Sequence, residues 1–192
     1  DRSRGLGDVY KRQVSRISGE GKDRRKVKGD YYLSEREEED LRYLAERNKP
    51  VILILNAGGP VELTDILEQT GNIKGILNIS QLGQEGGNAL ADVLLGKEVP
   101  SGKLTTSWAR RYEDYPASEE YGYLNGNLEK EKYKEGIYVG YRYFDSFDKK
   151  VMFPFGFGLS YTMFEMKCCS INMEESKIRA EAVSYTHLRA HE

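Results

Sequence analysis

Apolar residues recur at helical spacing in one early segment of the chain. Residues 34–48 carry Leu41 and Leu44 on one face and predict a helix. Ser34 and Glu37 have the spacing of a capping box at its start, and Pro50 follows its end. The sequence therefore predicts a helix with a defined first residue.

Continuous apolar runs and a further helical pattern follow this helix. Residues 51–56 (VILILN) and 75–80 (GILNIS) have the length and composition of strands buried on both faces. Residues 64–69 and 88–96 are expected to form helices, with Gly96 ending the second. This alternation predicts an α/β fold whose mostly parallel strands are joined by crossover helices.

The pattern changes in the second half of the chain. Residues 109–136 are polar and lack periodicity, which predicts a long loop. Strand-like composition returns at 137–145 and at 154–165. Residues 164–182 alternate about a turn at 172–175, so they are expected to form a hairpin that begins a separate β domain.

The two ends differ in texture from the rest of the chain. Residues 1–13 show no periodicity, and residues 183–192 interrupt an alternating pattern. Both resemble peptides translated from sequencing-adaptor DNA, so an interior fragment of about 14–182 is expected, although natural tails remain an alternative. Both histidines lie in the last segment, and no histidine-based catalytic or metal site is predicted.

Composition and motifs exclude several function classes. The 192 residues carry a net charge of −2, which argues against a nucleic-acid partner. No apolar run reaches the roughly 18 residues of a membrane span. The two cysteines, Cys168 and Cys169, are adjacent and predict neither a disulfide framework nor a zinc site. The chain has no G-x-G-x-x-G, no phosphate loop and no G-x-S-x-G elbow, so no nucleotide cofactor and no serine hydrolase are expected.

Glycine-rich loops follow the predicted strands. SGEG (18–21) comes after VSRI (14–17), while AGGP (57–60) and QLGQEGG (81–87) come after the two apolar runs. All three loops would lie at the edge of the sheet where α/β proteins bind ligands. Glu20 and Glu85 are the acids in these loops. Glu85 precedes a predicted helix and could simply cap it, whereas Glu20 is either a solvated loop acid or a carboxyl group that reaches a site.

Several segments together carry a resemblance to a known family. VSRISGEGKDRRKVKGDYYLS, NAGGPVEL, GQEGGNALADVLLGKEVPSGKL, YKEGIYVGYRYFD and PFGFGLSYTMFE resemble, in order and spacing, the second catalytic domain of glycoside hydrolase family 3, the β-glucosidase-like enzymes. The resemblance implies an α/β sandwich at 14–163, a preceding (β/α)8 barrel in the same chain, and the start of a fibronectin type III-like domain at 164–182. TTSWARR (105–111) and Leu82 depart from the family's usual residues.

The resemblance also implies a chemistry. Members are similar to other retaining glycosidases in using two carboxyl groups, one as nucleophile and one as acid/base. Glu20 would be the acid/base, with Asp23 and Arg24 in supporting roles, and the nucleophile would lie on the barrel. The substrate would be a β-linked oligosaccharide or glycoside, with no metal or cofactor, and this chain alone is expected to be inactive. A non-catalytic carbohydrate-binding or structural module is the alternative, and sugar specificity, compartment (bacterial cytoplasm or periplasm) and oligomeric state stay open.

Overall fold

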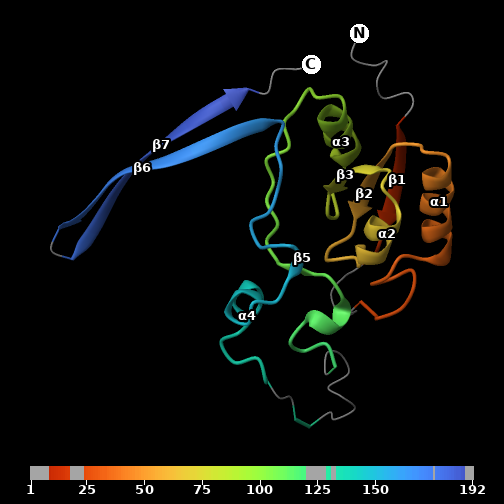
Figure 1. The fold of residues 1–192 in the computed structure, drawn as a ribbon, viewed down its shortest axis with the longest axis horizontal. Coiled ribbons are helices and arrows are strands. Elements are labelled where there is room, and N and C mark those ends of the chain that lie inside the picture. Colours follow the sequence, from red (N-terminus) through yellow and green to blue (C-terminus); the bar gives the residue numbers. More distant parts are fainter. Residues whose placement is uncertain (1–8, 18–23, 120–128, 131–132, 175, 189–192) are drawn as a thin grey trace.

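The first half of the chain is built on a small parallel sheet (Figure 1). The computed structural model describes residues 9–17, 24–119, 129–130, 133–174 and 176–188. Strands β1 (Tyr10–Ser15), β2 (Val51–Asn56) and β3 (Ile73–Asn78) lie in the order β1-β2-β3. Both pairs of strands are parallel, as the alternation of strands and helices along the sequence predicts.

Each of the three strands is followed by one helix. These helices are α1 (Glu35–Glu46), α2 (Thr64–Gln69) and α3 (Gly86–Leu94), which confirms the helices expected from the sequence. The predicted capping box is present at α1, where the Ser34 side chain accepts from the backbone of Glu37 and the Glu37 carboxylate accepts from the backbone of Ser34. Helices α1 and α2 lie side by side (Figure 1), and the Arg42 guanidinium of α1 donates to the Gln69 side chain of α2 at 3.3 Å. The strand–helix order thus produces the predicted α/β unit.

The central strand β2 explains the continuous apolar run in the sequence. Val51 and Leu53 are fully buried, and Leu55 is almost so. The rest of the buried core comes from β1, from α1 with Leu41, from α2, from the loops before α1 and after β2, and from the single tryptophan, Trp108; side chains of β3 pack against it partly buried. A strand covered on both faces has no need for polar alternation.

The first strand corrects the prediction for residues 1–13. Tyr10 to Gln13 pair in register with β2, and Val14 is completely buried, so the expectation that this segment lacks regular structure is wrong from Tyr10 onward. The strand has no readable alternation because Arg12, an ionic residue, faces Asp40 of α1 at 3.1 Å. Whether residues 1–13 and 183–192 are foreign stays a prediction.

The second half of the chain departs further from the sequence expectation. Strands β4 (Trp108–Ala109) and β5 (Val151–Phe153) form an antiparallel pair, and a short 3-10 helix, η2, spans Tyr112–Asp114. The segment 137–145, predicted as a strand, instead contains α4 (Tyr141–Ser146). Aromatic residues favour strands on average, but here packing of Phe144 against Tyr115 outweighs that preference.

The predicted hairpin is present and longer than expected. Strands β6 (Thr162–Glu174) and β7 (Lys177–Leu188) pair over their whole length and extend away from the α/β unit (Figure 1). The turn lies after Glu174 rather than at 172–175. Residues 183–188 continue β7, so the strand does not end at the point where the sequence pattern was expected to be interrupted. No helix among the described residues is long and apolar enough to span a membrane.

A close contact between two loops yields a stability prediction. The backbone N–H of Leu104 donates to the carbonyl oxygen of Phe157 at 2.8 Å. A Cβ added to the neighbouring Gly158 would lie 2.5 Å from the carbonyl oxygen of Gly102. Because backbone cannot move aside cheaply, Gly158→Ala is expected to lower the free energy of unfolding by about 1–3 kcal/mol. Urea unfolding measures the loss. Gly71→Ala, where a Cβ meets nothing within 4 Å, is the control and should not lower stability; equal stability of the two variants would contradict the prediction.

Candidate functional site

The carboxyl ends of β1, β2 and β3 define one edge of the sheet, because the strands are parallel. The loop 57–60 and the loop that precedes α3 leave this edge, as the sequence predicts. The first loop, with Glu20 and Asp23, lies at 18–23, outside the described residues. The candidate site is therefore built from the residues on either side of that loop.

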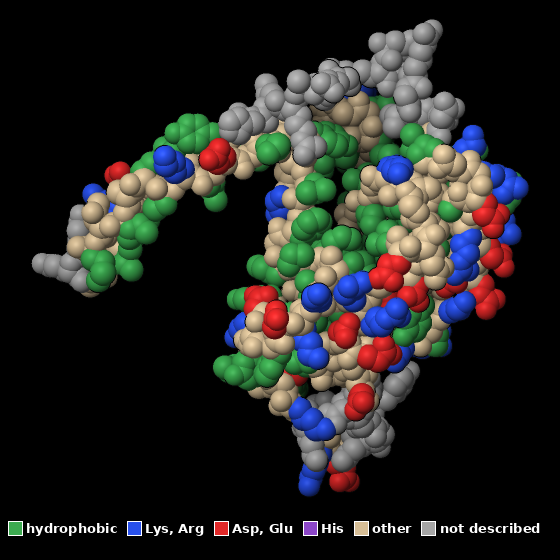
Figure 2. Space-filling model, viewed as in Figure 1, with side chains coloured by type: hydrophobic (Ala, Val, Ile, Leu, Met, Phe, Trp, Pro, Cys, Tyr) green, Lys and Arg blue, Asp and Glu red, His purple; other side chains and the backbone are tan. Residues whose placement is uncertain are grey.

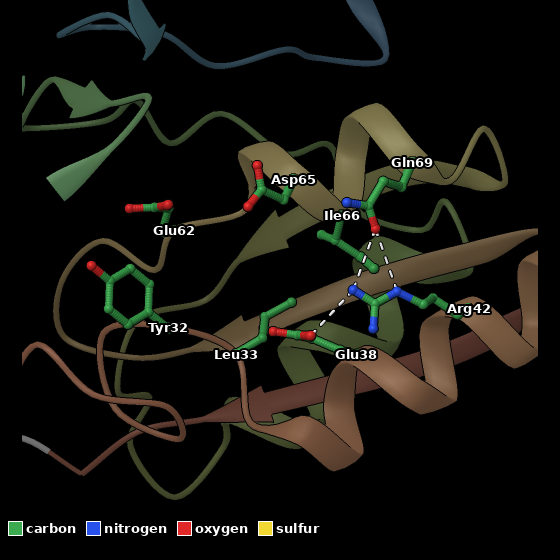
Figure 3. A pocket seen from close by; sticks show the side chains of 8 residues that line it. All are labelled: Tyr32, Leu33, Glu38, Arg42, Glu62, Asp65, Ile66 and Gln69. Atoms are coloured by element: carbon green, nitrogen blue, oxygen red, sulfur yellow. Dashed lines mark hydrogen bonds and ion pairs between the residues drawn. The ribbon is translucent and has the colours of Figure 1, made fainter.

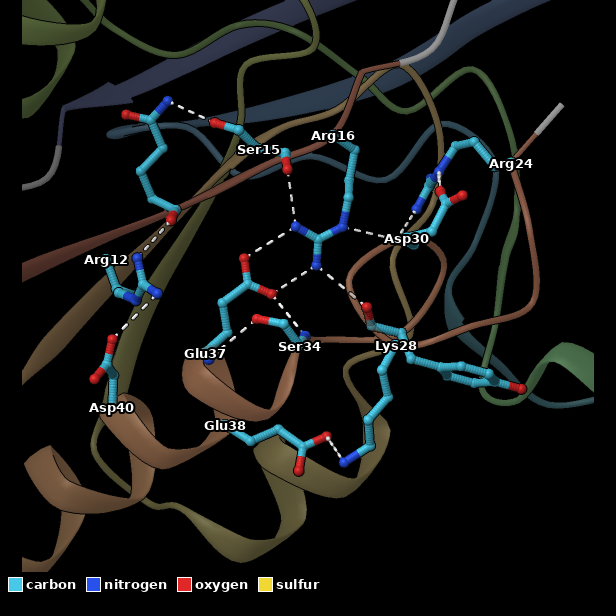
Figure 4. Close-up of polar contacts among 12 residues, drawn as sticks. Arg12, Ser15, Arg16, Arg24, Lys28, Asp30, Ser34, Glu37, Glu38 and Asp40 are labelled. Atoms are coloured by element: carbon cyan, nitrogen blue, oxygen red, sulfur yellow. Dashed lines mark hydrogen bonds and ion pairs between the residues drawn. The ribbon is translucent and has the colours of Figure 1, made fainter. Parts of the chain in front are cut away.

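Arg24, the predicted supporting residue, links the chain after the first loop to the AGGP loop and to Asp30, and Figure 4 shows its contact with Asp30. Its Nη1 donates to the carbonyl oxygen of Pro60 in the AGGP loop at 2.5 Å. Its Nε donates to the Asp30 carboxylate at 3.0 Å, and its Nη2 donates to the Asp30 carbonyl oxygen at 2.5 Å. Arg24 thus binds two backbone carbonyl oxygens and one carboxylate, and its side chain is mostly buried, 13% exposed.

The Asp30 carboxylate is the side-chain acceptor in this network around Arg24. Burial disfavours its charge, but hydrogen bonds from the backbone N–H of Arg25 and from the Arg24 guanidinium outweigh burial and hold the pKa of Asp30 below its usual value. Asp30 is therefore ionised at neutral pH and holds the segment that follows Arg24 in a tight turn. Gly29 occupies this turn with a φ of 81°, a conformation that disfavours a Cβ.

A buried ion pair lies next to this turn (Figure 4). Arg16 follows β1, and its guanidinium donates to both carboxylate oxygens of Glu37, at 2.9 and 2.6 Å. Both residues are 7% exposed. Burial alone would raise the pKa of Glu37, but the hydrogen bonds from Arg16 and from the Ser34 backbone lower it overall.

Tyrosines and acids form the rim beside Arg24. Tyr31 packs edge-on against Tyr112, with ring centroids 5.0 Å apart. The backbone N–H of Tyr112 donates to Glu62 at 2.9 Å. Burial nevertheless raises the pKa of Glu62 above its usual value. Lys26 bonds to Glu113 and lies 4.8 Å from the Tyr112 ring centroid, so the rim combines aromatic faces with paired charge.

Glu85 begins α3 but does not cap it through its side chain. Its backbone occupies the N-cap position, yet its carboxylate accepts from the Asn88 side chain at 2.5 Å and from no backbone N–H of the helix start. The capping interpretation is therefore wrong for the side chain. A Cβ on Gly86 would lie 2.3 Å from the Leu82 Cβ, so local packing accounts for this glycine.

A shallow hollow lies between α1 and α2, close to the rim (Figure 3). Its lining includes Tyr32, Glu62 and Arg42. Arg42 binds Glu38 at 3.2 Å and Gln69 at 3.3 Å, so these contacts link α1 to α2 across the hollow. No lining residue belongs to a glycine-rich loop, and the hollow is not the candidate site.

The described part of the chain holds no group of three or more His, Cys, Asp or Glu side chains that could bind a metal ion. The surface over α1 and α2 carries closely mixed charges of both signs (Figure 2). The chemistry available at the edge of the sheet is therefore that of carboxylates, arginines and tyrosine rings.

Comparison with known proteins identifies the family. Residues 8–141 match the family model described as the glycosyl hydrolase family 3 C-terminal domain. The chain belongs to glycosyl hydrolase family 3. The match covers the parallel sheet, the first three helices and the rim residues, so the candidate site lies wholly inside the family 3 domain.

Relatives within family 3 carry glycosidase names. Beta-glucosidase A of Butyrivibrio fibrisolvens is 39% identical, with 79% of this chain and 21% of that protein covered. An exo-alpha-(1->6)-L-arabinopyranosidase of Bifidobacterium breve is 40% identical over 66% of this chain and 16% of its own length. Beta-glucosidase 3B from Thermotoga neapolitana in complex with glucose superposes with a TM-score of 0.84 at 40% identity, covering 96% of this chain and 26% of that one. This family 3 chain thus spans about a fifth of the length of beta-glucosidase A.

Sequence reasoning missed part of the network in this family 3 domain. Arg24 was expected in a supporting role, but Arg16 and Asp30 were not singled out. Glu37 was recognised only as the second half of the capping box. Its second partner, Arg16, is 21 residues away along the chain, a separation that no local motif encodes.

Proposed function

We propose that the chain is the second catalytic domain of a retaining β-glycosidase, most similar to the β-glucosidases. The complete enzyme would hydrolyse O-glycosidic bonds at the non-reducing ends of β-glucosides. The observation that carries the proposal is the hydrogen-bond network at the sheet edge. Arg24, the residue directly after 18–23, donates to the carbonyl oxygen of Pro60 in the AGGP loop. Family membership and the names of the relatives support it.

Glu20 is proposed as the acid/base of this enzyme. A retaining glycosidase needs one carboxyl group that protonates the leaving oxygen and then activates water, and a second one about 5–5.5 Å away that attacks the anomeric carbon. The second carboxyl group would come from an aspartate on a preceding (β/α)8 barrel. Asp23 and Arg24 would support the loop that carries Glu20, and the contacts of Arg24 with Pro60 and Asp30 suit that role.

The hairpin is proposed as the start of a fibronectin type III-like domain. On one face, Met173 pairs across the strands with Ile178, and Met166 and Ile171 lie on the same face; the exposed fractions of these four side chains are 66–80%. The irregularity between Cys168 and Ser170 keeps these side chains on one face, because it offsets the change from even to odd numbering.

Charged residues gather on the other face of the hairpin. Glu181 accepts from the Ser170 hydroxyl there at 3.3 Å. Figure 2 shows the hydrophobic side chains uncovered along the hairpin. Met163, Val183 and Tyr185 also lie on this second face, so it is mixed. An apolar face opposite a face that carries the charged residues is what a single sheet of a β-sandwich has before its partner sheet covers it.

Activity measurements on two forms of the protein test the proposed function. The complete protein, with its preceding domain, is expected to hydrolyse p-nitrophenyl β-glucoside. The 192-residue chain alone is expected to give no turnover, because one carboxylate of the required pair is lacking. p-Nitrophenyl α-L-arabinopyranoside is assayed alongside, since one relative is named for that sugar.

Two results would overturn the proposal. Turnover by the isolated chain would show that the second carboxylate is not needed from another domain. A complete protein that folds, binds sugars and hydrolyses neither glycoside would instead indicate a non-catalytic carbohydrate-binding module.

A further inference from the structure

Every N–H group of the Arg16 side chain donates a hydrogen bond to the residues around it (Figure 4). A guanidinium has five N–H donors, and all of them are occupied here. Nη1 donates to the Ser15 carbonyl and to Glu37, Nη2 to the Tyr32 carbonyl and to Glu37, and Nε to the Asp30 carbonyl. The Arg16 side chain therefore holds the end of β1 against the backbone at Asp30 and Tyr32 and against the first turn of α1.

The two arginines that flank residues 17–23 meet at one atom. The carbonyl oxygen of Asp30 accepts from Arg16 Nε at 2.7 Å and from Arg24 Nη2 at 2.5 Å. Arg16 is further held by Glu37, and Arg24 by Pro60. Both ends of the intervening segment are thus fastened to the same point of the scaffold.

Stability alone is a weak reason for such a buried pair. Removing two charges from water offsets much of their attraction, and well-packed apolar pairs often stabilise a protein as well or better. A planar guanidinium does, however, fix direction, because its donors form a rigid fork that a lysine ammonium cannot reproduce. The geometry is that of an anchor for what lies between Arg16 and Arg24.

We propose that Arg16 and Glu37 are positioning residues for the acid/base loop. This inference rests on the proposed role of Glu20, which lies between the two arginines in the sequence. Arg16 is buried, so its role in this proposal is to fix the end of β1 from which the segment with Glu20 starts, not to bind the substrate. Catalytic groups displaced by about 1 Å lose on the order of 10²-fold in rate, so an anchor of this kind has a measurable effect.

The test compares Arg16→Lys with Arg12→Lys in the complete protein. Arg12 also joins β1 to α1, through Asp40 at 3.1 Å, but its side chain is 28% exposed and it precedes the buried part of the network. kcat/KM is measured for phenyl β-glucoside, whose leaving group needs a proton, and for 2,4-dinitrophenyl β-glucoside, whose leaving group does not. For Arg16→Lys, kcat/KM for phenyl β-glucoside divided by kcat/KM for 2,4-dinitrophenyl β-glucoside should fall by about 10- to 100-fold relative to wild type. Arg12→Lys should leave the ratio unchanged.

A merely structural role for Arg16 has a different signature. It would lower the fraction of folded enzyme and reduce both kcat/KM values equally, so an unchanged ratio in folded Arg16→Lys enzyme would overturn the proposal. Glu37→Asp, which keeps the charge and withdraws it by one methylene, provides the same readout and decides the matter if Arg16→Lys does not fold. Glu20→Ala is measured in parallel. If its ratio is unchanged, the proposed function itself fails, whereas a shifted ratio in Glu20→Ala with none at Arg16 removes the positioning role only.

Discussion

Glu20→Ala in the complete protein is expected to lower kcat/KM for phenyl β-glucoside by about 10²- to 10⁴-fold, the usual contribution of a general acid. The same variant should retain most of its kcat/KM for 2,4-dinitrophenyl β-glucoside, because that leaving group departs without a proton. The kcat for the dinitrophenyl substrate should nevertheless fall, since the second step needs Glu20 as the base that activates water. The ratio of the two kcat/KM values measures the acid role.

Azide measures the base role separately. A small anion that needs no deprotonation can replace water in the second step, so added azide should partly restore kcat of Glu20→Ala and yield a glycosyl azide. Glu98→Ala is the matched control: Glu98 is likewise a glutamate close to a glycine, but it lies in the loop after α3. Unchanged hydrolysis of both substrates by Glu20→Ala would contradict the assignment.

The regular part of the fold could be predicted because its signals are local. β2 and α2 appear at the expected residues, since a buried apolar run and a short helical pattern each depend on neighbours in sequence. The capping box of α1 was equally readable. The end of β1 was anticipated only through the SGEG loop that follows VSRI. Tyr10 to Gln13 were missed, because β1 is an edge strand held by backbone pairing and by an ion pair rather than by apolar alternation.

The site was predictable in its location but not in its supporting network. Parallel strands place their following loops at one edge, and glycine-rich segments mark those loops in the sequence. The contacts that hold the loops are carbonyl acceptors on Asp30, Tyr32 and Pro60. Every residue carries such an oxygen, so residue identity does not indicate which one an arginine will find.

The Arg16–Glu37 pair also yields the largest expected change in stability. Glu37→Ala in the 192-residue chain is expected to lower the free energy of unfolding by about 3–5 kcal/mol, because it leaves the Arg16 charge buried without a partner. Urea unfolding followed by the fluorescence of Trp108, the single tryptophan and only 4% exposed, measures the loss. Asp40→Ala, which breaks the more exposed pairs with Arg12 and Arg36, should cost at most about 1 kcal/mol.

The pH dependence of that loss follows from the lowered pKa of Glu37. A carboxyl group whose pKa is lower in the folded than in the unfolded chain stabilises the fold above the unfolded value, about 4.3 for glutamate. This contribution disappears as the pH falls through the folded pKa. The difference between the wild-type chain and Glu37→Ala should therefore be constant above about pH 5 and narrow below about pH 4.

Replacing both partners separates the buried charge from the loss of packing. Arg16→Met combined with Glu37→Met removes both charges and keeps apolar volume, so this double variant should be more stable than Glu37→Ala alone. The carbonyl oxygen of Asp30 keeps its bond from Arg24 in the double variant, and that of Tyr32 keeps the bond from the backbone N–H of Gly29. A double variant less stable than Glu37→Ala would show that the five hydrogen bonds of Arg16, rather than charge compensation, hold this part of the fold.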